Sequence, residues 1–113
     1  MAEEVQAFLE QYGKDMEKVK QALPEAVTAF GGLFAKVMKD GALSVKQKEL
    51  IALGIGMAVR CEPCIILHTQ KCLQTGATRQ EILEAAAVAV VMQGGPTYTH
   101  LPRVLAALDA LGA

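Results

Sequence analysis

Two segments of the sequence are apolar on nearly every side of a helix, and they constrain the fold more than any other feature. Residues 50–59 are LIALGIGMAV, and residues 85–92 are AAAVAVVM. A helix without a polar face has to be enclosed by protein on all sides. A domain of 113 residues has a small interior and encloses one such helix more easily than two. We therefore expect part of the second segment to be buried between the subunits of a homo-oligomer.

The first third of the chain carries the signals of two amphipathic helices, and no segment has the alternating pattern of a strand. Apolar residues recur at spacings of three and four over residues 3–23 and 25–39. Pro24 suits the first turn of the second helix, and Gly41 follows its end. These patterns predict two consecutive helices.

The rest of the chain predicts further helices with short connections. Two capping boxes, Ser44 with Gln47 and Thr78 with Glu81, open helices that end near residues 59 and 93. A helix begins between them near Cys61, and a last helix is expected over residues 97–111 after the GGP sequence. The chain is thus expected to form a single all-α domain over residues 1–113, a compact bundle of about six helices.

Composition excludes several classes of partner. The net charge is −1, no basic run is present and aromatic residues make up 4%, so nucleic acid is not an expected partner. The longest apolar run is too short to cross a membrane, and the N-terminal MAEEVQAF lacks the features of a signal peptide. We expect a cytoplasmic protein. Because the cytoplasm keeps thiols reduced, the paired cysteines of this chain point to metal binding or redox chemistry.

The sequence CEPCIILH, residues 61–68, concentrates reactive side chains on one helical face. At about 100° per residue, Cys61, Cys64, His68 and Cys72 all point to the same side. For Cys72 alone we favour simple packing, because a lone cysteine is often a buried, inert residue. Three reactive groups in the remaining set suggest either a metal site or a redox site.

The spacing C-x₂-C-x₃-H-x₃-C resembles a zinc-binding pattern, but helical geometry argues against four ligands. On a helix, Cys61 and Cys72 lie about 16 Å apart along the axis, whereas zinc–ligand bonds are about 2.0–2.3 Å. Partial zinc binding by the cysteine pair and His68 remains open. A non-catalytic zinc-binding oligomer is therefore kept as an alternative.

The redox interpretation suits the local sequence best. Pro63 favours the first turn of a helix, which places Cys61 at the N-cap and Cys64 within the first turn. Free backbone N–H groups and the helix dipole then stabilise a thiolate. Glu62 opposes this effect unless its side chain points into solvent. His68, one turn beyond Cys64, can carry a proton to or from the sulfur.

Glu49 has two interpretations from the residues alone. It precedes the apolar segment, and in an antiparallel helical hairpin it lies opposite His68, where it could pass a proton toward Cys64. Alternatively it belongs, with Lys46 and Lys48, to the solvated first turn of a capped helix.

The combination of Glu49 with Cys61-x-x-Cys64-x-x-x-His68 resembles the signature of the carboxymuconolactone decarboxylase superfamily, in its AhpD-like alkylhydroperoxidase branch. The resemblance covers roughly residues 24–108. It implies an all-α homo-oligomer, a trimer or hexamer, whose cysteine pair cycles between dithiol and disulfide. Peroxides or disulfides are the implied substrates, with a lipoyl-bearing protein or a peroxiredoxin as the type of electron donor, and no cofactor or metal is expected.

The resemblance also implies a role for each residue of the signature. Cys64 attacks the peroxide and forms a sulfenic acid, Cys61 resolves it to a disulfide, and His68 with Glu49 relays protons. The decarboxylase branch lacks the cysteine pair, so the resemblance does not imply decarboxylation. A lyase or decarboxylase that uses His68 and Glu49 on a small carboxylate remains as an alternative.

One position departs from the family pattern. In the studied AhpD proteins an aromatic hydroxyl residue precedes the second cysteine, whereas Pro63 stands here. Tyr98 could supply that hydroxyl if the segment after GGP lines a pocket over the cysteines. For His100 in the same segment we favour a surface or helix-capping role.

Overall fold

The computed structural model describes all 113 residues, and every regular element in it is a helix. The seven helices are α1 Ala2–Ala22, α2 Pro24–Val37, α3 Val45–Ala58, α4 Glu62–Gln74, α5 Arg79–Gln93, α6 Gly95–Tyr98 and α7 Leu101–Ala110. The predicted all-α class is confirmed. No helix in the chain is both long and apolar enough to cross a lipid bilayer.

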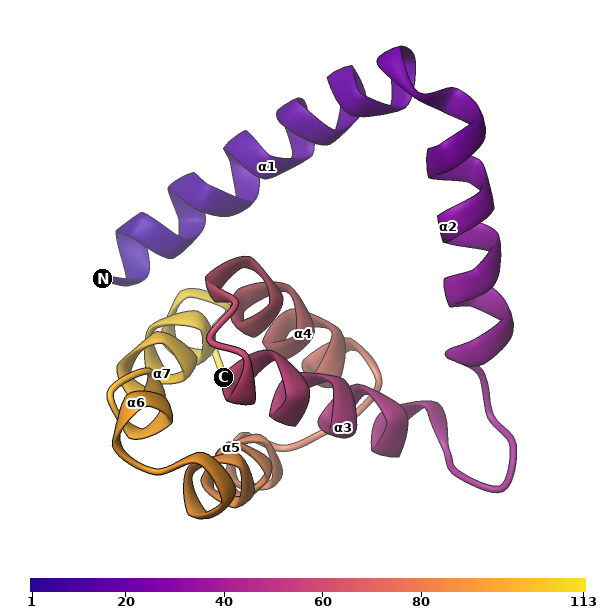
Figure 1. Cartoon of the computed structure of the whole chain (residues 1–113). Coiled ribbons are helices and arrows are strands. Elements are labelled where there is room, and N and C mark those ends of the chain that lie inside the picture. The colour runs from indigo at the N-terminus through magenta and orange to yellow at the C-terminus, as the bar shows by residue number, and fades with distance from the viewer.

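The helices divide into a packed body and a projecting arm (Figure 1). In the body, α3 packs against both α4 and α5, and α4 packs against α7. The arm consists of α1, which starts against α7, and α2, which turns back from the far end of α1 and stands apart from the body. At its C-terminal end α2 is tied to α3, because the Lys48 ammonium donates to the carbonyl oxygens of Val37 and Lys39 at 2.9 and 2.8 Å.

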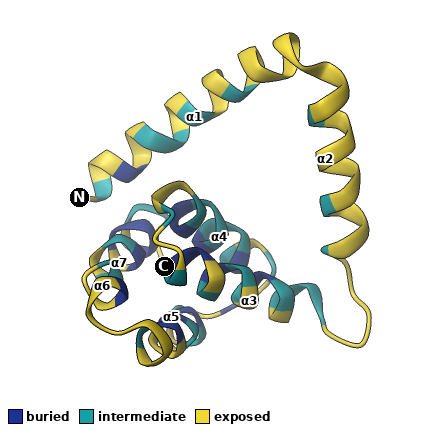
Figure 2. Cartoon of the chain, in the orientation of Figure 1, coloured by how far each residue is buried: buried dark blue, intermediate teal, exposed yellow.

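The hydrophobic core lies in the body and extends only to the first turns of the arm. Its buried side chains form one large cluster: Leu53, Met57, Ile65, Cys72, Ala77, Ile82, Ala86, Ala89, Val104 and Leu108. A smaller cluster joins Val5 of α1 to Ile66 of α4 and Ala106 and Ala107 of α7. Figure 2 shows that buried residues are confined to these regions, and α2 has none.

The two predicted capping boxes are present and fix the start of α3 and α5. The hydroxyl of Ser44 accepts from the backbone N–H of Gln47 at 3.1 Å, and the Gln47 side chain accepts from the Ser44 N–H at 2.8 Å. Thr78 and Glu81 make the same reciprocal pair at 3.1 and 2.8 Å. Each box satisfies two N–H groups that a helix otherwise leaves unpaired.

The prediction of one continuous helix over residues 97–111 is wrong, because the structure has two helices there, α6 and α7. Residues Thr99 and His100 form a turn between them. Pro102 explains the break, because in a continuous helix its ring would clash with the carbonyl of Tyr98 and it has no N–H to donate. In the first turn of α7, where no N–H is needed, it is accommodated.

The two apolar segments are each buried on one side only within the single chain. Leu53 and Met57 of α3 are in the core, whereas Ile51 and Ile55 are exposed. In α5, Ile82, Ala86 and Ala89 face the core, and Val88, Val91 and Met92 are exposed. The burial on all sides that the sequence suggests is therefore not provided by this chain alone.

Candidate redox site

A tight turn between α3 and α4 places the cysteine pair. The N–H of Cys61 donates to the Gly56 carbonyl at 3.0 Å, and that of Arg60 donates to the Met57 carbonyl at 3.1 Å. This pattern is a Schellman motif, which normally has glycine in the left-handed position. Arg60 occupies it here with φ of 56°, a conformation that costs a non-glycine residue about 1 kcal/mol. The turn thereby places Cys61 at the start of α4.

Cys61 is the N-cap of α4, as the sequence predicts. Its sulfur accepts a hydrogen bond from the Cys64 N–H at 3.3 Å, and Pro63 lies in the first turn. The two cysteines are joined by a disulfide, with their Cα atoms 5.2 Å apart. That distance lies within the usual range for disulfides, so the start of the helix holds the two cysteines close enough to form a disulfide bond. After reduction, the Cys64 N–H and the helix dipole would stabilise a thiolate at Cys61.

The approach of α3 to α4 depends on Gly56, which no motif in the sequence marks. A Cβ atom at this position would lie 3.0 Å from the Cβ of Cys64 and 3.5 Å from its carbonyl carbon. Ordinary carbon–carbon contacts are about 3.5–4.0 Å. The absence of a side chain at Gly56 therefore allows the backbone of α3 to lie directly against Cys64.

Glu49 and His68 form a buried pair across the α3–α4 interface. The Nδ1 atom of His68 lies 2.7 Å from Oε1 of Glu49, and Glu49 is only 3% exposed. Because an ionised carboxylate can only accept, Nδ1–H is the donor, and Nε2 is the nitrogen that is free to take up a proton. The predicted placement opposite His68 is confirmed, and the alternative of a solvated helix start for Glu49 is wrong.

The ring of Phe34 covers His68 from the arm. The two ring centroids are 6.3 Å apart with the planes inclined by 27°, and the Lys71 ammonium lies 3.9 Å from the centroid of Phe34. Phe34 thus contacts both an imidazole and a cation of α4. The sequence indicated only that Phe34 lies on an amphipathic helix, since the contact joins residues far apart in the chain.

Cys72 does not belong to the reactive set. Its side chain is fully buried in the core and its thiol is free. Burial, together with the negative charge of nearby Glu49, raises the pKa of Cys72 to about 12. The thiol therefore stays protonated at neutral pH and is a poor nucleophile, which agrees with the predicted packing role.

Glu62, which lies between the two cysteines in sequence, is drawn away toward α7. Its Oε1 atom lies 3.2 Å from Nε of Arg103, and Arg103 also contacts the carboxylate of Glu4 at 3.3 Å. The hydrogen bond to Glu4 and the charge of Glu62 raise the pKa of the Arg103 guanidinium. The guanidinium offsets the negative charge that would otherwise oppose a thiolate at the start of α4.

The segment after GGP makes its contacts locally. Tyr98 is exposed, and the His100 ring donates through Nδ1 to the Pro96 carbonyl at 2.8 Å. His100 is also the N-cap residue of α7. The His100 side chain makes no capping hydrogen bond to α7, so a capping role for it stays a prediction, as does a part for Tyr98 at the cysteines.

No group of three or more His, Cys, Asp or Glu side chains is arranged to hold a metal ion. The four residues of the zinc-like pattern are separated instead into a disulfide, an imidazole paired with Glu49, and the buried Cys72. The arrangement offers a thiol pair at a helix start, with an oriented imidazole one turn away.

Comparison with known proteins gives consistent similarities over nearly the whole chain. A model of the carboxymuconolactone decarboxylase family matches residues 24–110. An uncharacterized protein of Cupriavidus necator is 33% identical over 113 residues, and the alignment covers 100% of both chains. Uncharacterized protein 4 in the cox locus of Paracoccus denitrificans is 39% identical over 83 residues, covering 74% of this chain and 75% of that protein.

Solved structures agree with this similarity. A carboxymuconolactone decarboxylase family protein from Legionella pneumophila superposes with a TM-score of 0.91 at 34% identity, covering 97% of this chain and 98% of that one. A family protein from Thermotoga maritima, with a suggested role in an antioxidative response, superposes with a TM-score of 0.70 at 37% identity, covering 76% and 89%.

Proposed function

Because this chain belongs to the carboxymuconolactone decarboxylase family, we propose that it is a thiol oxidoreductase that reduces hydroperoxides with the Cys61–Cys64 pair. One observation carries the proposal: a cysteine pair at a helix start lies one turn from an imidazole that a buried carboxylate orients. The suggested antioxidative role of the Thermotoga maritima relative is in line with it.

In the first step the thiol proton of Cys64 passes to Nε2 of His68. The Cys64 thiolate then attacks the terminal oxygen of the hydroperoxide, and the O–O bond breaks. Sulfur is oxidised to a sulfenic acid, and the departing alkoxide takes the proton from His68 and leaves as an alcohol. Glu49 keeps the imidazole in the tautomer and orientation that this transfer needs.

In the second step Cys61 resolves the sulfenic acid. Its thiolate, stabilised by the N-cap hydrogen bond, attacks the sulfur of Cys64. The S–O bond breaks, and the hydroxide leaves as water with the proton that Cys61 released. The product is the Cys61–Cys64 disulfide.

A dithiol donor closes the cycle by thiol–disulfide exchange. A donor thiolate attacks one sulfur of the disulfide, and its second thiol releases the mixed disulfide, so the donor is oxidised and the pair is reduced. We propose that this takes place in the cytoplasm, where thiol reductants are abundant.

The test is to titrate the accessible thiols of reduced, metal-free protein before and after one equivalent of hydroperoxide, with mass spectrometry to map the bonds. We expect two thiols to be lost and a Cys61–Cys64 disulfide to appear. Cys64→Ser should abolish peroxide consumption, and Cys61→Ser should leave a sulfenic acid at Cys64 that a carbon nucleophile traps. Cys72→Ala, the matched control, should behave like the wild type.

Other outcomes would favour the alternatives. If the Cys61→Ser and Cys64→Ser variants both keep full activity, the proposed roles are wrong, and acid–base chemistry by His68 and Glu49 on a small carboxylate becomes the better explanation. If the reduced protein takes up one equivalent of zinc and resists peroxide, the cysteine pair serves metal binding instead.

A further inference from the structure

The turns after α3, α4 and α7 have the same hydrogen-bond pattern, a Schellman motif with one left-handed residue just beyond the end of the helix. Gly76 and Gly112 occupy the left-handed position after α4 and α7, with φ of 94° and 75°. Arg60 occupies it after α3, with φ of 56°, and is the only residue other than glycine with a positive φ in the chain. After α4 and α7 the chain thus has the residue that this conformation favours, and after α3 it does not.

The exceptional turn is the one that leads into the cysteine pair. Arg60 directly precedes Cys61, and the Cα atoms of consecutive residues are about 3.8 Å apart. Glycine would fit the turn without the cost of a left-handed side chain, and unfavourable backbone conformations of this kind cluster at functional sites. What arginine supplies here and glycine cannot is a guanidinium on the residue next to the cysteine pair.

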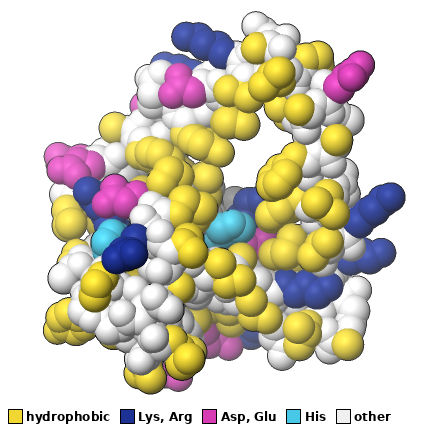
Figure 3. Space-filling model, in the orientation of Figure 1, with side chains coloured by type: hydrophobic (Ala, Val, Ile, Leu, Met, Phe, Trp, Pro, Cys, Tyr) yellow, Lys and Arg dark blue, Asp and Glu magenta, His cyan; other side chains and the backbone are white.

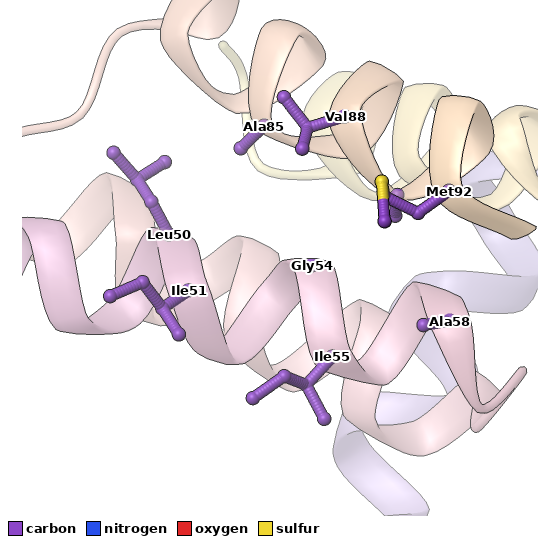
Figure 4. Close-up of a pocket in the computed structure, with 9 residues that line it drawn as sticks. Leu50, Ile51, Gly54, Ile55, Ala58, Ala85, Val88 and Met92 are labelled. Atoms are coloured by element: carbon purple, nitrogen blue, oxygen red, sulfur yellow. The ribbon is translucent and has the colours of Figure 1, made fainter.

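The guanidinium of Arg60 has no carboxylate partner. Arg60 is exposed and takes part in none of the ion pairs of the chain, whereas the other two arginines, Arg79 and Arg103, each pair with at least one carboxylate. The ten residues before it, LIALGIGMAV, carry no charge, and Figure 4 shows the apolar side chains of α3 as far as Ala58. The end of α3 therefore offers nothing that would neutralise the guanidinium.

The positive charge of Arg60 is a local feature of this turn. The other charged side chains of the region have partners already: Glu62 and Glu4 with Arg103, Glu49 with His68, and Lys71 with the ring of Phe34. The face shown in Figure 3 has no continuous basic patch, because Lys and Arg side chains are scattered over it with hydrophobic side chains between them. Of the two charged residues that flank Cys61 in sequence, Glu62 is thus compensated and Arg60 is not.

We propose that Arg60 is a positioning residue of the redox site, whose guanidinium stabilises the thiolate of the reduced Cys61–Cys64 pair, and that this is why arginine stands in a turn that favours glycine. A unit charge about 4–8 Å from a sulfur in water shifts the balance between thiol and thiolate by about two- to sixfold. The inference rests on the proposed function in that a thiolate is the reacting group there. The effect on the thiols themselves holds for any substrate of the pair.

Three variants of the full chain separate the charge from the backbone conformation. Arg60→Lys keeps both the charge and the left-handed side chain, Arg60→Gln keeps only the left-handed side chain, and Arg60→Gly removes both. The rate at which iodoacetamide, a neutral reagent, alkylates the reduced pair is measured against pH. Arg79→Gln, which removes an arginine on α5, is the matched control.

The midpoint of this pH profile should rise by about 0.3–0.8 pH unit in Arg60→Gln and Arg60→Gly, because the thiolate loses its nearby cation. Arg60→Lys and Arg79→Gln should keep the wild-type midpoint. Urea unfolding should show Arg60→Gly to be more stable than the wild type and than Arg60→Gln, since glycine fits the left-handed position. A purely structural role for Arg60 would not make the most stable variant one of the least reactive.

An unchanged midpoint in Arg60→Gln and Arg60→Gly, or the same rise in Arg60→Lys as in Arg60→Gln, would overturn the proposal. Peroxide consumption by the wild type tests the proposed function separately. A wild type that leaves hydroperoxide intact while the Arg60 variants shift as expected would refute hydroperoxide reduction and uphold the role of Arg60.

Discussion

Replacement of Gly56 by alanine tests the close approach of α3 to the redox helix. The new Cβ would lie 3.0 Å from the Cβ of Cys64, so one helix has to move by about 0.5–1 Å to reach an ordinary contact. Overpacking of this kind costs about 1–3 kcal/mol. Alanine also stabilises a helix interior by about 0.5–1 kcal/mol relative to glycine. The net effect should therefore be a loss of stability of up to about 2.5 kcal/mol.

Gly13→Ala is the matched control for this prediction. Gly13 is also in a helix interior, and a Cβ there meets nothing within 4 Å, so the change should stabilise the protein by about 0.5–1 kcal/mol. The difference between the variants isolates the contact with Cys64, about 1–3 kcal/mol, and urea unfolding of the reduced proteins measures it. If Gly56→Ala is as stable as Gly13→Ala, the reasoning about this interface is refuted.

Three further perturbations have definite expected outcomes. Because the pKa of Cys72 rises from 9.0 to about 12 on folding, the unfolded chain loses this proton first, and stability should fall above pH 9 by up to about 1.4 kcal/mol per pH unit. Urea unfolding at pH 8 and pH 10 measures this loss of stability, which should be smaller in Cys72→Ala than in the wild type. An equal loss in both proteins would contradict the prediction. Ser44→Ala removes the cap of α3 and should cost about 1 kcal/mol, read from the thermal midpoint, whereas no change would mean that the capping box does not stabilise the helix. Arg103→Met leaves the negative charge of Glu62 unopposed and should raise the pKa of the more acidic thiol of the reduced Cys61–Cys64 pair. The pKa is measured from the dependence of the alkylation rate on pH. Adding Glu62→Gln to this variant should reverse the shift.

The local features of the fold could be predicted because neighbouring residues decide them. The capping boxes at Ser44 and Thr78, and the N-cap position of Cys61, follow from side chains that bond the backbone within three residues. The division of the last helix was missed, although Pro102 was a visible signal for it.

The all-α class, the cysteine pair at a helix start and the histidine one turn beyond follow from the order of residues alone, because helical period and capping act over a few residues. Packing between helices is what buries Glu49 against His68, brings Gly56 against Cys64 and places Phe34 over the imidazole. These contacts join different helices, and their geometry depends on how whole helices pack. The same applies to the apolar side chains that α2, α3 and α5 leave exposed, since the apolar pattern specifies burial without specifying which surface provides it.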